Sequence, residues 1–259
     1  MGMFDLHGTT ALVTGAGDAD GIGFACARTL ASLGAKVAVA ATSSRITQRV
    51  RELRRGGATA IGQVADLTDP AQAAHLVDVV REQLGALDIV VNNAGMTSVS
   101  RPQDPASTDE IAPASWVHAV ERNLHTALYV TQAALPAMRV AGFGRVVNIA
   151  SISGPLVAYP GDVGYHAGKA GMVGMTRALA VEVAGTGVTA NAVAPGWIDT
   201  PSLTADERAM GARTPARRCG TPDEVAAAVA FLASREAAYV SGHLMVVDGG
   251  VTAAQVKLA

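Results

Sequence analysis

The sequence predicts an α/β protein in which seven parallel strands form a doubly wound sheet, in a single domain spanning residues 1–259. Short apolar runs rich in Val, Ala, Leu and Ile alternate with longer Ala-rich segments of helical character, as in repeated strand–helix–strand units. Most of these short runs are apolar throughout, as expected for strands that helices cover on both faces. No linker-like segment or internal repeat divides the chain.

The expected elements follow this alternation along the chain. Strands are expected over residues 10–14, 36–41, 60–65, 87–91, 144–150, 188–193 and 244–247. Helices are expected over residues 21–33, 46–55, 70–84, 113–140, 164–184 and 223–234. Two polar, irregular segments, residues 96–112 and 198–221, each follow the carboxyl end of a strand. Open α/β sheets bind ligands at that edge, so we expect both segments to be substrate loops.

Composition favours a small-molecule role. The 20 basic residues nearly balance the 22 acidic ones, so no net charge draws the protein to nucleic acid or to an anionic membrane. The longest apolar run, residues 225–233, is too short to span a bilayer, and residues 1–8 carry no apolar signal segment. We therefore expect a cytoplasmic protein. The two cysteines and six histidines follow no metal-ligand spacing, so no metal site is predicted.

A glycine-rich string lies between the first strand and the first helix. Residues 14–23 read Thr-Gly-Ala-Gly-Asp-Ala-Asp-Gly-Ile-Gly. Glycines at this point let a pyrophosphate approach the backbone N–H groups at the amino end of the helix. The expected nucleotide contacts are Gly15, Gly17, Gly21, Ile22 and Gly23.

Tyr165 and Lys169 lie four residues apart in an expected helix and therefore share one face. A tyrosine normally titrates near ~10, and a nearby positive charge favours its phenolate. We expect Lys169 to lower the pKa of Tyr165, so that Tyr165 acts as a general acid or base.

Further motifs occur in a characteristic order over almost the whole chain. They are Asn-Asn-Ala-Gly at residues 92–95, Asn123, Ser151 followed by Tyr165 and Lys169, Pro195-Gly196 with Thr200, and Val240-Ser241-Gly242 through Val247-Asp248-Gly249-Gly250. In these motifs the chain resembles the short-chain dehydrogenase/reductase family. The most similar branch includes 3-oxoacyl-carrier-protein reductases and many small alcohol dehydrogenases.

The resemblance implies an oxidoreductase that transfers a hydride between NADP(H) or NAD(H) and a secondary alcohol or ketone. It assigns catalysis to Asn123, Ser151, Tyr165 and Lys169, with Tyr165 as general acid/base, Ser151 on the substrate oxygen and Asn123 in a proton relay through Lys169. The expected cofactor contacts beyond the glycine-rich string are Asp66, Leu67, Asn93, Ala94, Gly95, Tyr165, Lys169, Pro195, Gly196, Ile198 and Thr200. The expected substrate contacts are Ser151, Ser153, Tyr159, Tyr165 and Trp197. A homotetramer is expected through the helices at 113–140 and 164–184.

The end of the second strand bears on cofactor choice. Enzymes selective for NAD usually place an acid there to bind the ribose 2′-hydroxyl, but Ala41 occupies this position. Thr42, Ser43 and Arg45 offer hydroxyl groups and a charge for a 2′-phosphate, so NADP is preferred over NAD.

The glycine-rich string departs from the family pattern. Five residues, instead of the usual three, separate Gly15 from Gly21, and they include Asp18 and Asp20. Asp20 is expected to cap the helix that follows. The length resembles the enoyl-reductase branch, in which the catalytic Tyr precedes Lys by seven positions. Asp162 occupies that position here, which argues against enoyl reduction.

Two alternatives come from other functional classes. One is a non-catalytic nucleotide-binding scaffold or sensor on the same fold, which has no need to keep Ser151, Tyr165 and Lys169 together. The other is a lyase resembling halohydrin dehalogenases, which carry Arg at the position of Lys169. His166 is expected to have no catalytic role, because it faces away from the Tyr–Lys pair.

Overall fold

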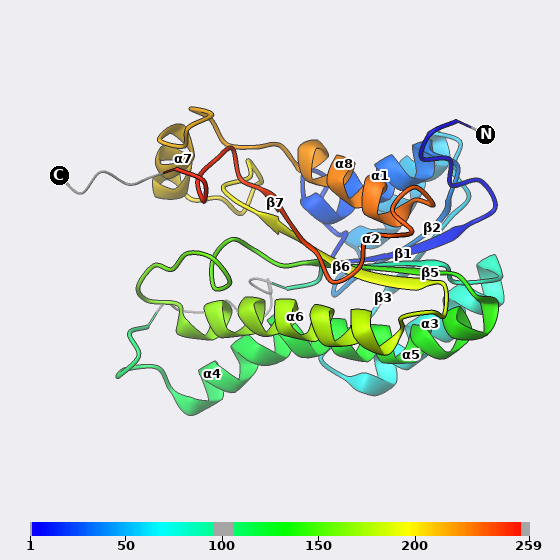
Figure 1. The fold of residues 1–259 in the computed structure, drawn as a ribbon, viewed down its shortest axis with the longest axis horizontal. Helices are drawn as coiled ribbons and strands as arrows, with labels where there is room; N and C mark the ends of the chain where they lie inside the picture. Colours follow the sequence, from blue (N-terminus) through cyan, green and yellow to red (C-terminus); the bar gives the residue numbers. More distant parts are fainter. Residues whose placement is uncertain (1, 96–105, 255–259) are drawn as a thin grey trace.

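Seven strands form one sheet in the order β3-β2-β1-β4-β5-β6-β7, and every neighbouring pair is parallel (Figure 1). The computed structural model describes residues 2–95 and 106–254. The strands are β1 (Thr10–Thr14), β2 (Lys36–Ala41), β3 (Ala60–Val64), β4 (Ile89–Asn92), β5 (Gly144–Ile149), β6 (Val188–Pro195) and β7 (Leu244–Val247). β1, β2 and β7 have the bounds that the sequence predicts, and the ends of the others differ by one or two residues. The predicted doubly wound sheet is therefore confirmed.

Helices cover both faces of the sheet (Figure 1). One face packs against α1 (Ile22–Ser32), α2 (Arg45–Arg55) and α8 (Pro222–Ala233), through a core that includes Phe24, Val50 and Val229. The other packs against α3 (Pro70–Leu84), α5 (Thr126–Ala141) and α6 (Val163–Glu182), through a core that includes Leu76, Val130 and Leu179. This burial on both faces explains why β1, β4 and β6 are buried along their whole lengths. Among the described residues, no helix is long and apolar enough to cross a membrane.

The direction of winding reverses between β1 and β4, which lie side by side at the centre of the sheet. Thr14 joins their carboxyl ends, because its hydroxyl oxygen accepts the N–H groups of Asn93 and Ala94, both at 3.0 Å. The same hydroxyl lies 3.4 Å from the carbonyl oxygen of Val91, to which it donates. Ligands of doubly wound sheets bind at this kind of reversal, so these contacts fix the edge where a site is expected.

A chain of polar side chains crosses the buried layer between the sheet and the helices α5 and α6. Asn92 donates to Thr131 and to Asn148, and Asn148 donates to Thr176, all at 2.8–2.9 Å. Because buried polar groups are costly to leave unpaired, this chain fixes how both helices sit on β4 and β5.

Two segments differ from the sequence-based expectation. The helix expected over 113–140 is divided into α4 (Pro113–Val120), a wider π-helical turn at Glu121–His125, and α5. Asn123 lies in that turn, and such turns occur often at functional sites. The segment 198–221 was expected to be irregular, but it contains α7 (Ala205–Ala212). A reciprocal capping box between Thr204 and Glu207 starts this helix.

Candidate functional site

The glycine-rich loop after β1 is shaped by close backbone approaches. Gly15 has a φ of +67°, and a Cβ atom there would lie 2.8 Å from the Cα atom of Ala94. A Cβ atom on Gly23 would lie 2.5 Å from the Nδ2 atom of Asn93. Only glycine fits at these two positions, because real Cβ contacts are not that short. The loop therefore lies against the Asn-Asn-Ala-Gly segment that follows β4.

Asn93 acts on the loop through its side chain. Its Nδ2 atom donates to the carbonyl oxygens of Thr14 and Gly15, both at 3.1 Å. These bonds hold the first turn of the loop in place, so Asn93 shapes the loop of the predicted cofactor site.

The start of α1 differs from the expectation for Asp20. The helix is capped by Gly21 without any side-chain hydrogen bond, so the predicted Asp20 cap is wrong. Asp18 instead accepts the backbone N–H of Asp20 at 3.0 Å, and this local turn competes with capping.

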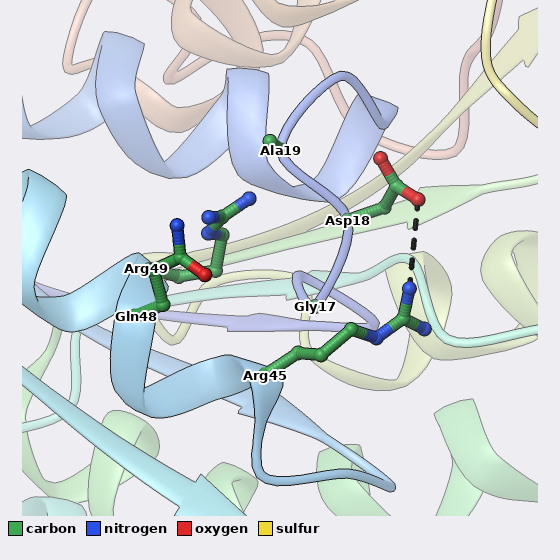
Figure 2. Close-up of a pocket in the computed structure, with 6 residues that line it drawn as sticks. All are labelled: Gly17, Asp18, Ala19, Arg45, Gln48 and Arg49. Carbon is green, nitrogen blue, oxygen red and sulfur yellow. Dashed lines mark ion pairs between the residues drawn. The ribbon is translucent and has the colours of Figure 1, made fainter.

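A pocket of about 220 Å³ lies between the glycine-rich loop and α2, lined by Gly17, Asp18, Ala19, Arg45, Gln48 and Arg49 (Figure 2). Two of the lining residues, Arg45 and Asp18, form an ion pair at 3.8 Å (Figure 2), and Arg45 also donates to Ser43 at 3.3 Å. Ala41 lies next to the pocket residue Gly17, because a Cβ atom on Gly17 would be 3.0 Å from the Cβ atom of Ala41. The structure thus brings together the predicted residues Gly17, Ser43 and Arg45.

The side chains of Asp66 and Leu67, two further predicted cofactor contacts, are both engaged by the protein itself. Asp66 accepts the backbone N–H of Thr68 at 3.0 Å and its hydroxyl at 2.7 Å, forming a turn before α3. Leu67 is buried in the core on the α3 face, so its side chain is not available to a ligand.

The carboxyl end of β5 and the first turns of α6 bring together Ser151, Tyr165 and Lys169. Lys169 is buried, and its Nζ atom donates to the carbonyl oxygen of Ile149 at 2.8 Å. The Nζ atom lies 5.8 Å from the centroid of the Tyr165 ring. Ser151 interacts with the Tyr165 hydroxyl and accepts the N–H of Ser153 at 3.0 Å. The three predicted catalytic side chains therefore meet at one edge of the sheet.

The electrostatics of this group differ from the prediction. Burial lowers the pKa of Lys169 to about 8. Burial also raises the pKa of Tyr165, with further contributions from Asp162 and Glu207, while the hydrogen bond with Ser151 acts in the opposite direction. The expectation that the pKa of Tyr165 is lowered is therefore wrong, because loss of hydration dominates.

Asn123 lies close to Lys169 and belongs to a different element, the π-helical turn before α5. It is fully buried, and its Nδ2 atom donates to the carbonyl oxygen of Ala119 at 3.0 Å. A Cβ atom on Gly95 would lie 3.0 Å from the Oδ1 atom of Asn123 and 3.3 Å from the Nζ atom of Lys169. Gly95 thus marks the point where Asn123 and Lys169 converge.

The segment after β6 closes the other side of the site. Pro195 accepts the N–H of Ile152 at 3.0 Å, which joins this segment to the loop that carries Ser151. Gly196 packs on Asp248, because a Cβ atom there would lie 2.8 Å from the Cβ atom of Asp248. Ile198 is buried, while Trp197 and Thr200 are partly exposed. Of the substrate loops expected at 96–112 and 198–221, residues 96–105 lie outside the described residues.

Three residues to which the sequence analysis gave no functional role contribute to the site. Thr14 holds the Asn93 segment, Arg49 lines the pocket beside Arg45, and His166 holds Tyr159. The Nε2 atom of His166 accepts the backbone N–H of Tyr159 at 3.2 Å, and the two rings are 4.4 Å apart. The spacing of Arg49, four residues after Arg45 on α2, could have indicated its role, whereas Thr14 meets Asn93 only through the folding of separate elements.

The site fits a dinucleotide. Its glycine-rich loop has no room for side chains at Gly15 and Gly23, and the pocket beside the loop carries two arginines. Among the described residues, no group of His, Cys, Asp or Glu is arranged to hold a metal ion.

Comparisons with known proteins agree with this architecture. A family model described as enoyl-(acyl carrier protein) reductase matches residues 15–252. The chain is 40% identical over 254 residues to 3-oxoacyl-(acyl-carrier-protein) reductase FabG of Escherichia coli K12, covering 95% of this chain and 98% of the relative. It is 42% identical over 247 residues to cis-4-hydroxycyclohexanecarboxylate dehydrogenase of Sinomonas cyclohexanicum, covering 94% and 96% respectively.

The fold is also similar to that of a solved structure. The crystal structure of a gluconate 5-dehydrogenase from Burkholderia cenocepacia, in complex with NADP and tartrate, matches with a TM-score of 0.88 and 34% identity. The match covers 97% of this chain and 98% of that one. These findings define a Rossmann-fold oxidoreductase. The chain belongs to the short-chain dehydrogenase/reductase family.

The burial of Lys169 leads to a prediction about how the stability of the folded protein depends on pH. Since folding lowers the pKa of Lys169 from 10.5 to about 8, burial of its charge destabilises the protein below pH 8. This penalty is lost as the pH rises from 8 to 10.5. The wild type should therefore gain stability relative to Lys169→Met over this range, by on the order of 3 kcal/mol. Urea unfolding of both proteins at several pH values measures the difference, and parallel pH curves would contradict a buried, charged Lys169.

Proposed function

We propose that the protein transfers a hydride between NADP(H) and a secondary alcohol or ketone, with Tyr165 as general acid/base. The observation that carries this proposal is the convergence of Ser151, Tyr165, Lys169 and Asn123 at the carboxyl edge of the sheet, beside a glycine-rich loop. Bound NADPH would supply the hydride.

The chain's own residues would handle the proton. A raised pKa keeps the Tyr165 phenol protonated at neutral pH, so it is ready to donate to an oxygen that gains negative charge. Ser151 would donate a hydrogen bond to the same oxygen. The charged Lys169 would stabilise the phenolate that remains, and Asn123, which converges with Lys169 at Gly95, would help return a proton to it.

The cofactor would be held by the glycine-rich loop, the segment at residues 93–95 and the segment from Pro195 to Thr200. NADP is supported by Arg45 and Arg49 at the pocket, by the absence of an acid at position 41, and by the NADP in the related gluconate dehydrogenase structure. NAD is the second choice, because Asp18 places a negative charge beside Arg45.

The substrate class is supported by the relatives, one named as a 3-oxoacyl reductase and others as dehydrogenases of hydroxylated compounds. The half-exposed side chain of Tyr159, which lies near Tyr165, favours a substrate with an apolar flank. The family model's description names enoyl reduction instead, but Asp162 occupies the position of the enoyl-reductase tyrosine and accepts the N–H of Tyr165 at the start of α6. A non-catalytic scaffold has no need for the buried, costly Lys169. A panel of ketones and alcohols assayed with both cofactors tests the proposal.

Tyr165→Phe tests the acid/base role. The change retains the ring and removes the transferable proton, so turnover should fall by on the order of 10²–10⁴-fold while cofactor binding stays nearly intact. Tyr129→Phe is a matched control, because Tyr129 on α5 packs against the hydrophobic core and also loses only a hydroxyl. Steady-state rates and nicotinamide fluorescence give both readouts. Turnover of Tyr165→Phe within a few-fold of wild type would rule out the assignment.

Ala41→Asp tests the cofactor preference. A carboxylate there would bind the 2′-hydroxyl of NAD and repel the 2′-phosphate of NADP. It should weaken NADP relative to NAD at least tenfold, or about 1.4 kcal/mol of selectivity. Ala41→Asn is the uncharged control and should shift selectivity much less. A wild type that already favours NAD in kcat/KM would overturn the preference without affecting the hydride-transfer proposal.

We also propose a homotetramer, as the family resemblance implies. Apolar side chains on α4, α5 and α6 are exposed in the single chain, among them Trp116, Val117, Leu128 and Val181. Light scattering should give the mass of four 26.2 kDa chains. A stable and active monomer would refute this assembly.

A further inference from the structure

The pocket beside the glycine-rich loop holds two arginines in different states (Figure 2). Arg49 is fixed, because it is buried, donates to Glu52 at 2.6 Å and lies 5.1 Å from the centroid of the Phe24 ring. Its Nε atom is buried without a hydrogen-bond partner among the described residues. The pocket therefore has one cation that stays in place and retains an unused donor.

Arg45 is held much less firmly. Its side chain is 55% exposed, and its contacts are a long ion pair with Asp18 at 3.8 Å and a bond to Ser43 at 3.3 Å. Exposed ion pairs of this kind contribute about 0–1 kcal/mol, so Arg45 is free to change partner.

In the ion pair between Asp18 and Arg45, Asp18 is the residue held in place, because it also bonds to the backbone of the glycine-rich loop. One carboxylate oxygen accepts the backbone N–H of Asp20, while the other faces Arg45. Asp18 belongs to the five residues between Gly15 and Gly21, so the lengthened loop is what brings a carboxylate to the arginines.

We propose that Asp18 determines cofactor specificity by competing with a ribose 2′-phosphate for Arg45. This inference rests on the proposed function, since it concerns the same dinucleotide site. Without a phosphate, Asp18 offsets the charge of Arg45, so that a nucleotide with a free 2′-hydroxyl leaves no unpaired cation. With a phosphate, Arg45 exchanges Asp18 for the stronger anion, and Asp18 then repels that anion. Asp18 therefore lowers the preference for NADP and makes NAD acceptable.

The test uses adenosine fragments, so it needs neither turnover nor a known substrate. Calorimetry gives the affinities of 2′,5′-ADP and 5′-AMP, which differ by the 2′-phosphate alone. Asp18→Asn should strengthen binding of 2′,5′-ADP by about three- to tenfold and that of 5′-AMP by less than twofold. Asp20→Asn removes the same charge from the same loop, but Asp20 forms no ion pair with Arg45 among the described residues. It should leave the ratio of the two affinities within twofold of wild type.

A double variant identifies the partner. If Asp18 acts through Arg45, Asp18→Asn should change the ratio much less in an Arg45→Gln background. Three results would overturn the inference. The ratio of the affinities for 2′,5′-ADP and 5′-AMP could stay unchanged in Asp18→Asn, or Asp20→Asn could change it equally. Asp18→Asn could also change the ratio by the full amount in the Arg45→Gln background. The NADP proposal fails on a separate result, in which the wild type binds 2′,5′-ADP no better than 5′-AMP. The effect of Asp18→Asn on the ratio of these two affinities still decides the role of Asp18. Melting temperatures confirm that each variant is folded.

Discussion

The pairing of β1 with β4 at the centre of the sheet is the constraint on which the rest of the site depends. The direction of winding reverses there, so the helices that follow these strands leave on opposite faces and the strand ends stay uncovered. Thr14 holds this point with one hydroxyl that accepts two backbone N–H groups. At about 1 kcal/mol for each bond, the energy is modest, but the bonds decide where the glycine-rich loop and the Asn93 segment meet.

The second important feature is a buried positive charge. Lys169 is deep in the protein, with the carbonyl oxygen of Ile149 as its hydrogen-bond acceptor. Burying a lysine destabilises the folded protein, so its position is best understood through what it faces. It lies below the Tyr165 ring and beside Asn123, where a negative charge on the tyrosine oxygen would be stabilised as it forms. In the proposed reaction, the unfavourable energy of burying Lys169 would be offset as negative charge develops on Tyr165, as expected for a perturbed group in a functional site.

The two ends of the proposed dinucleotide site are built differently. At the reacting end, side chains are buried and fixed by hydrogen bonds, because proton transfer depends on exact placement of atoms. At the proposed adenosine end, Arg45 and Asp18 are half exposed and weakly paired, so small changes of charge there would alter which nucleotide is accepted without moving the reacting groups. Arg49 is the rigid exception, since Phe24 and Glu52 hold it.

The sequence alone determined the fold class and most element bounds to within two residues, because apolar strands covered on both faces and Ala-rich helices leave a strong local pattern. The spacing of Tyr165 and Lys169 on one helix is local information, while the grouping of Ser151 and Asn123 with them came from the family resemblance, and the structure brings all four together. Tertiary structure decided the rest. The contacts of Thr14 with Asn93 and of Arg49 with Phe24 join segments far apart in the chain, and the π-helical turn at Asn123 and the helix within 198–221 were not expected from the sequence. The direction of the Tyr165 pKa shift was also beyond the sequence, because it depends on how completely the surrounding elements exclude water, and only the packed structure fixes that.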